Sequence, residues 1–219
     1  MSRPLLGVIF DMDGVLCDSE ALTAEAGCRM FAETYNIRVD PREFEPFVGT
    51  GEDRYISGVA DKHGIKLTMP RDKERMYAIY SEIACGKLSP LCGVHDFIAE
   101  CRHRHLKLAV ASSADRVKVD INLREISLPA ETFNAVLSGS NATHKKPHPE
   151  VFLKASKCLG LDPAYCLVVE DAPSGVKAAK SACARCLGLT TSFSEAVLRE
   201  SGADHIAPDL AHLPQDFHW

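Results

Sequence analysis

Two carboxylates set two residues apart are the first side chains of this sequence suited to chemistry. Asp11 and Asp13 lie in the segment Phe10-Asp-Met-Asp-Gly14. On an extended chain this spacing points both carboxylates to the same side, so that both can act on one substrate. Gly14 lets the chain turn away sharply after them. Alone, the pair is explained equally well as two solvated acids in a loop.

Two further polar clusters carry groups that bind anions. Ser112 and Ser113 end an apolar run and precede a helical pattern, and hydroxyls and amides at a helix N-terminus suit an anion. Lys146 stands just before Pro147 and Pro149, which fix the approach to another helix. Taken singly, a serine here is explained as a helix N-cap and the lysine as a solvated surface charge.

A fourth cluster, Glu170 and Asp171, follows the apolar run 166–169. Grouped with Asp11, these acids form a set of hard oxygen ligands of the kind that Mg²⁺ accepts, with waters and a substrate phosphate completing the octahedron. The structural alternative is that Asp171 caps a helix. The first interpretation predicts Mg²⁺ as cofactor, and the second needs no ligand.

The elements that would position these clusters alternate between strand and helix. Short apolar runs are typical of strands covered on both faces, and helical spacing separates them, as at Val94, Phe97, Ile98 and Cys101. The predicted strands are 5–10, 106–111, 135–137, 166–169 and, more weakly, 185–189. This alternation predicts an α/β fold, a Rossmann-like parallel sheet flanked by helices. All four clusters then fall at or just beyond strand ends, where open α/β sheets bind ligands.

One stretch breaks the alternation. From about residue 19 to residue 89, apolar residues such as Leu22, Ala26 and Met30 follow helical spacing without a strand partner. We predict a small helical domain at 19–89, inserted into an α/β core formed by 1–18 and 90–219, with boundaries uncertain by about five residues. A length of 219 residues fits one core plus a modest insert.

Composition narrows the functional classes. With 25 Lys and Arg against 30 Asp and Glu, the net charge is −5, and no basic stripe stands out to follow a nucleic-acid backbone. No apolar run is long enough to span a membrane, and residues 1–4 are too short for a targeting segment. Nine scattered cysteines, an odd number, argue against a disulfide framework. We expect a reducing compartment, the cytoplasm or the chloroplast stroma, and no nucleic-acid or membrane partner.

The four clusters together form a specific pattern: D-x-D-G-V-L-x-D-S-E, then A-S-S, then K-P-x-P-x-x-F, then E-D-A-x-x-G. Over essentially the whole chain it resembles the haloacid dehalogenase superfamily of phosphohydrolases, in the β-phosphoglucomutase-like branch. The resemblance implies that the helical insert is a cap over the active site. It also implies a Mg²⁺-dependent phosphatase acting on a small phosphomonoester, in a protein that works as a monomer.

The resemblance assigns roles residue by residue. Asp11 would be the nucleophile that forms an aspartyl-phosphate, and Asp13 the acid and base. Ser112 and Lys146 would hold the transferring phosphoryl group. The metal ligands would be Asp11, the Asp13 carbonyl, Glu170 and Asp171. The substrate- or phosphate-binding residues would be Gly14, Ser113, Arg116, Thr23 and Glu52.

Two alternatives remain at this point. A phosphosugar mutase would return the phosphoryl group to another hydroxyl, but Thr23 and Gly51 stand where the mutase pattern has a histidine and an arginine. The other alternative is a protein-interaction or regulatory domain with weak hydrolase activity. It is motivated by the segments 48–52 and 109–116, which resemble one module of a larger chloroplast protein.

Overall fold

The predicted strands and one more form a single parallel sheet in the computed structural model, which describes residues 3–49, 51–215 and 217–219. The strand order is β3-β2-β1-β4-β5-β6. The strands are β1 (Gly7–Phe10), β2 (Lys107–Ala111), β3 (Ala135–Leu137), β4 (Cys166–Glu170), β5 (Arg185–Leu189) and β6 (His205–Ala207). Every neighbouring pair is parallel, so the predicted fold class is confirmed. The edge strand β6 was not predicted.

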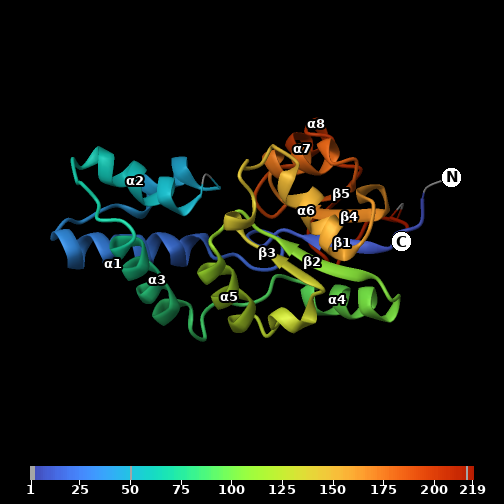
Figure 1. Cartoon of the computed structure of the whole chain (residues 1–219), viewed down its shortest axis with the longest axis horizontal. Helices are drawn as coiled ribbons and strands as arrows, with labels where there is room; N and C mark the ends of the chain where they lie inside the picture. Colours follow the sequence, from blue (N-terminus) through green and yellow to red (C-terminus); the bar gives the residue numbers. More distant parts are fainter. Residues whose placement is uncertain (1–2, 50, 216) are drawn as a thin grey trace.

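Helices cover both faces of this sheet (Figure 1). Along β1, Val8 and Phe10 enter the core on one face and Ile9 enters the core on the other, as the alternation of a strand requires. The Phe10 ring meets Phe97 of α4 edge to face. The core helices are α4 (Val94–His103), α5 (Arg116–Glu125), α6 (Glu150–Leu159), α7 (Pro173–Ser181) and α8 (Glu195–Glu200). Helices α6, α7 and α8 pack on the Ile9 face.

The helical pattern predicted from Val94 to Cys101 is present as α4, and α6 buries one apolar face in the same way. The four apolar positions predicted for α4 are buried. In α6, Val151, Phe152, Ala155 and Leu159 are buried, but Cys158 is exposed. The helix ends at Gly160, whose φ of 66° is the left-handed conformation that glycine adopts without steric cost.

Residues 20–84, described apart from residue 50, hold helices and no strand. The elements are α1 (Glu20–Tyr35), η1 (Pro41–Phe47), α2 (Glu52–Lys62) and α3 (Arg71–Ala84). These helices pack on one another beside the sheet, around the buried side chains of Met30, Phe31 and Phe44 (Figure 1). Among the described residues, the main contact between this segment and the helices of the sheet is that of α3 with α5. The chain enters and leaves this segment at one place, because Leu91 N donates to Leu16 O at 3.0 Å.

Short 3₁₀ turns complete the chain between the core elements. They are η2 (Ala130–Thr132), η3 (Gly139–Asn141) and η4 (Pro163–Tyr165). All nine cysteines are free thiols. Within the described residues, none of the helices is both long and apolar enough to cross a bilayer.

Candidate active site

The carboxyl ends of three adjacent strands bring the polar clusters to one edge of the sheet. Asp11 follows β1, Ser112 follows β2, Glu170 ends β4, and Asp171 comes directly after it. The strands are in register, since Phe10 of β1 pairs with residue 110 of β2 and with residue 169 of β4. The side chains that follow these strands therefore converge, as the sequence predicted.

Lys146 lies at the centre of this group although it comes from the loop before α6. Its Nζ donates to Asp11 Oδ1 at 2.6 Å, to Glu170 Oε1 at 2.5 Å and to the Ala111 carbonyl at 3.3 Å. Its side chain is only 7% exposed. A buried ammonium is stable only when its donors are paired, and here they are satisfied by two carboxylates and a backbone oxygen. The lysine thus ties the ends of three strands together.

Three carboxylates crowd around that lysine. One oxygen each from Asp11, Glu170 and Asp171 lies within 4.8 Å of the others. Burial raises the pKa of the Asp11 and Asp171 carboxyls above their usual range, and the neighbouring Glu170 charge adds to the rise, whereas Lys146 opposes it. One lysine leaves this cluster with excess negative charge. A divalent cation with a preference for oxygen ligands would neutralise it.

Two glycines let the backbone approach these acids. A Cβ on Gly14 would lie 2.0 Å from Asp171 Oδ2, and Gly14 has a φ of +75°. A Cβ on Gly175 would lie 1.8 Å from Glu170 Oε1. Glu170 Oε2 in turn accepts from the backbone N–H groups of Asp171 and Ala172 at 3.1 and 3.2 Å. The first turn of α7 and the loop after β1 are therefore shaped to hold carboxylates in place.

Asp13 has a different set of contacts from Asp11. The Ser19 hydroxyl donates to Asp13 Oδ1, and Lys118 Nζ of α5 donates to Oδ2 at 3.2 Å. Lys118 Nζ also lies 3.7 Å from Glu52 Oε1 at the start of α2. The side chains of Lys118 and Glu52 are each 7% exposed. Lys118 therefore links an acid of the core to an acid of the helical segment.

A cavity of about 460 Å³ opens above these side chains. The sheet edge lines one part of it. The helical segment lines another with Glu20, Thr23, Glu45, Phe47 and Tyr55, among others. The acids of the sheet edge therefore face a space large enough for a small metabolite.

Three of the five predicted substrate- or phosphate-binding residues line the cavity. Ser113, Thr23 and Glu52 line the cavity together with Ser112. The Thr23 hydroxyl donates to the Ser19 carbonyl at 2.8 Å, so it is occupied by its own helix. Gly14 lies against Asp171 rather than on the cavity wall.

Arg116 is not brought to the cavity. It lies at the first residue of α5, exposed, and its Nε donates to Asp120 Oδ1 at 2.8 Å, one turn further along the same helix. Arg116 therefore forms an ion pair with Asp120 of its own helix, because residues four apart on a helix are neighbours.

Sequence reasoning missed Lys118, the second cation that lines the cavity. One feature of the sequence could have indicated this lysine. Asp115, Lys118 and Asn122 fall at i, i+3 and i+7, so they share one face of the helix. That face meets α3 through polar contacts: Asp115 Oδ2 accepts from Tyr77 at 3.0 Å, and Asn122 accepts from Tyr80. A lysine on a helix face otherwise packed against neighbours indicates a buried ion pair.

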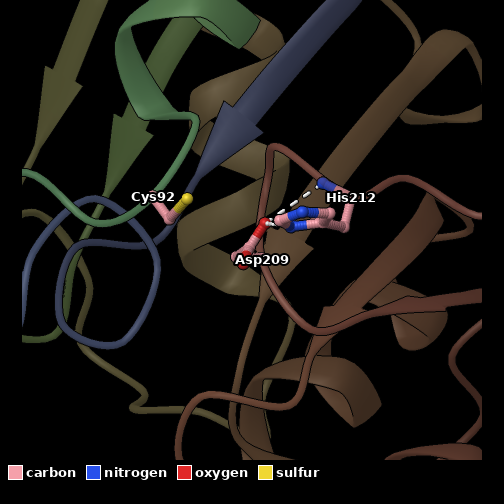
Figure 2. Close-up of side chains that lie close together, drawn as sticks. All are labelled: Cys92, Asp209 and His212. Carbon is pink, nitrogen blue, oxygen red and sulfur yellow. Dashed lines mark hydrogen bonds and ion pairs between the residues drawn. The ribbon is translucent and has the colours of Figure 1, made fainter.

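A separate group of metal-binding residue types lies where the turn before α4 meets the segment after β6 (Figure 2). Ligand atoms of Cys92, Asp209 and His212 lie within 4.8 Å of one another. Asp209 Oδ1 already accepts from the N–H groups of Ala211 and His212 and from His212 Nδ1 at 2.8–3.1 Å. These bonds form a local turn, which explains the positions of Asp209 and His212 without an ion.

Comparison with known proteins identifies the class to which this fold and site belong. The family model for haloacid dehalogenase-like hydrolases matches residues 8–189. The chain belongs to that family, and the predicted family and fold are confirmed.

Individual relatives show which members of the family the chain resembles. The chain is 41% identical to the chloroplastic protein Suppressor of Quenching 1 of Arabidopsis thaliana over 94% of its own length, and it spans about a fifth of that protein. It is 31% identical to a phosphorylated carbohydrates phosphatase of Thermotoga maritima, covering 90% of this chain and 91% of the relative. The crystal structure of CbbY from Rhodobacter sphaeroides with phosphate superposes with a TM-score of 0.81 at 25% identity, covering 94% and 95% of the two chains. The predicted enzyme class, a phosphoric monoester hydrolase, is confirmed.

Proposed function

We propose that the protein is a Mg²⁺-dependent phosphatase that hydrolyses a small phosphorylated carbohydrate through an aspartyl-phosphate on Asp11. The observation that carries this proposal is the Asp11 carboxylate, held by Lys146 at the inner end of a metabolite-sized cavity beside two further acids. The relative from Thermotoga maritima, named for phosphorylated carbohydrates, supports the substrate class.

The acid cluster fits Mg²⁺. Its three carboxylates supply hard oxygen ligands close to one another, and their charge exceeds what Lys146 balances. Asp11, Glu170 and Asp171 would hold the ion together with the Asp13 carbonyl. When bound, the ion supplies positive charge against the phosphoryl oxygens.

Each remaining step is assigned to a side chain of this protein. Asp11 attacks phosphorus, and the bond from phosphorus to the leaving oxygen breaks while Asp13 gives that oxygen a proton. Ser112 donates to the equatorial oxygens, and the positive charge of Lys146 beside Asp11 attracts them, which holds the group in line. Asp13 then takes a proton from the water that attacks the acyl phosphate, which releases phosphate and restores Asp11. Ser19 and Lys118 fix the plane of the Asp13 carboxylate for both transfers.

We further propose that residues 19–89 form a cap domain over a core made of 1–18 and 90–219. The helical segment lines the cavity, and its two ends meet at Leu16 and Leu91. A hinge at one place would let the cap exclude water during the reaction.

Hydrolysis is favoured over the mutase alternative by the cap side of the cavity. Gly51 offers no side chain there, and the Thr23 hydroxyl is bonded to its own helix. Purified protein with Mg²⁺ should release phosphate from sugar phosphates. Conversion of β-glucose 1-phosphate to glucose 6-phosphate in the presence of a bisphosphate activator, without net phosphate release, would overturn the proposal.

A further inference from the structure

The part of the cavity formed by the helical segment is acidic. Glu20 at the start of α1, Glu45 in η1 and Glu52 at the start of α2 all line it. None of these three belongs to the cluster at the sheet edge that the proposed chemistry uses. They come from three separate elements, so their gathering on one wall is a property of the folded segment.

The described residues that line the cavity offer only two cations, Lys118 and Lys146. Lys146 is committed to Asp11 and Glu170. Lys118 lies between Asp13 and Glu52; Lys118 and Glu52 are buried, and Asp13 is half-buried. Lys145 comes near Gly51, but its Nζ donates to the Gly139 carbonyl at 2.9 Å and it is not part of the lining. A second anionic group on a substrate would therefore find carboxylates and no uncommitted cation among these lining residues.

Apolar and aromatic groups accompany the acids. Phe47, Val48 and Tyr55 line the same part of the cavity. Carboxylates accept hydrogen bonds from hydroxyl groups, and aromatic faces pack against the C–H surface of a carbon skeleton. This combination suits a hydroxylated, uncharged or positively charged leaving group.

We infer that the site selects phosphomonoesters whose leaving group carries no negative charge, and that Glu20, Glu45 and Glu52 exclude substrates with a second phosphate or a carboxylate. The inference rests on the proposed phosphatase function and deepens it. Its physical basis is repulsion between like charges in a partly enclosed space, where screening by water is weaker than in solution.

Substrates matched in skeleton test the selection. Glucitol 6-phosphate and 6-phosphogluconate differ only in that a CH₂OH group is replaced by a carboxylate. We expect kcat/KM to favour glucitol 6-phosphate by at least about tenfold. Glucosamine 6-phosphate should be hydrolysed at least as well as glucose 6-phosphate. Equal values for the first pair, or a preference for 6-phosphogluconate, would overturn the inference.

Variants test which residues are responsible. The double variant Glu20→Gln, Glu45→Gln removes two charges that are exposed at the cavity wall, and it should reduce the preference for glucitol 6-phosphate about fivefold. Glu25→Gln changes an exposed acid of α1 that is not part of the lining, and it should leave the preference unchanged. An unchanged preference in the double variant contradicts the assignment.

Binding separates failure of this inference from failure of the proposed function. The Asp11→Asn variant should bind glucitol 6-phosphate more tightly than 6-phosphogluconate in calorimetry. If no compound yields phosphate with the unmodified protein, the proposed function fails, and the order of binding still decides the inference. If phosphate is released but neither turnover nor binding discriminates, the inference alone fails.

Discussion

The two sides of the cavity are built in opposite ways. At the sheet edge, acids from adjacent strand ends lie around one buried lysine. The backbone at Gly14 and Gly175 packs so closely against two of these acids that a Cβ atom would overlap them. Across the cavity, the acids of the helical segment stand on separate helices, and Glu20 and Glu45 are exposed. Only Glu52 on that side is buried in an ion pair.

This difference predicts which substitutions should affect turnover and which should affect substrate preference. A rigid cluster of acids held by one buried lysine suits a reaction common to all substrates, because its geometry is fixed before substrate binds. A wall of exposed side chains that come from separate helices suits discrimination between substrates. Changes at the sheet edge should therefore reduce turnover of every substrate, whereas changes in the helical wall should alter the order of preference.

The largest effect should come from Asp11→Asn. The amide cannot act as a nucleophile, so kcat should fall by at least about four orders of magnitude for every phosphomonoester. Phosphate release measures this loss. Asp18→Asn, which changes an exposed acid outside the cavity, serves as the matched control and should retain nearly full activity. Substantial turnover by Asp11→Asn would contradict the assignment of the reaction to the acids at the sheet edge.

Lys146→Met should come next. It removes the positive charge from the transferring group and leaves Asp11 and Glu170 without their shared partner, so kcat/KM should fall by about 10²- to 10³-fold. Loss of a buried ion-pair partner should also cost about 3–5 kcal/mol in the free energy of unfolding without metal. Denaturant titration and steady-state kinetics measure the two losses. Lys154→Met, at an exposed ion pair of α6, should change neither by much.

Metal removal should destabilise the protein in a pH-dependent way. Burial raises the pKa of the Asp11 and Asp171 carboxyls above that of the unfolded chain. The folded state then binds protons more tightly than the unfolded state, so the free energy of unfolding falls as the pH rises from about 4 through the raised values. Thermal unfolding with EDTA and with Mg²⁺ should differ by several degrees, more at alkaline than at acidic pH. Equal melting temperatures with and without Mg²⁺ at every pH would contradict a metal site there.

The smallest effect should come from Thr23→Val in the helical wall. The hydroxyl is bonded to the Ser19 carbonyl within its own helix, and such bonds contribute little to helix stability. We expect kcat/KM to change by less than about threefold for all substrates. A change of tenfold or more in one substrate alone would show that this hydroxyl contacts the leaving group.

The sheet edge could be predicted from the sequence because strand ends and motif order are local signals. Apolar runs located five strands, and parallel register brought Asp11, Ser112 and Glu170 together. Strand β6 (His205–Ala207) has only two apolar residues, which follow a histidine, so it lacks the unbroken apolar run that predicted the equally short β3.

The helical wall was less predictable because its side chains are positioned by packing between helices. Lys118 and Glu52 are brought together from α5 and α2, and no spacing along the chain relates them. Arg116 looked suited to phosphate by its residue type, but its local partner Asp120 holds it outside the cavity. Charge alone could not tell which of the three basic residues of α5, Arg116, Lys118 and Arg124, faces inward.

The most direct test of the central claim is to look for the covalent intermediate. Protein mixed with a hydrolysable phosphomonoester and Mg²⁺ is quenched in acid within the first turnover, and its peptides are examined by mass spectrometry. We expect one phosphoryl group on the peptide that contains Asp11, and none in Asp11→Asn. Continued turnover with no phosphorylated peptide, or with the phosphoryl group on another residue, would contradict Asp11 as the nucleophile.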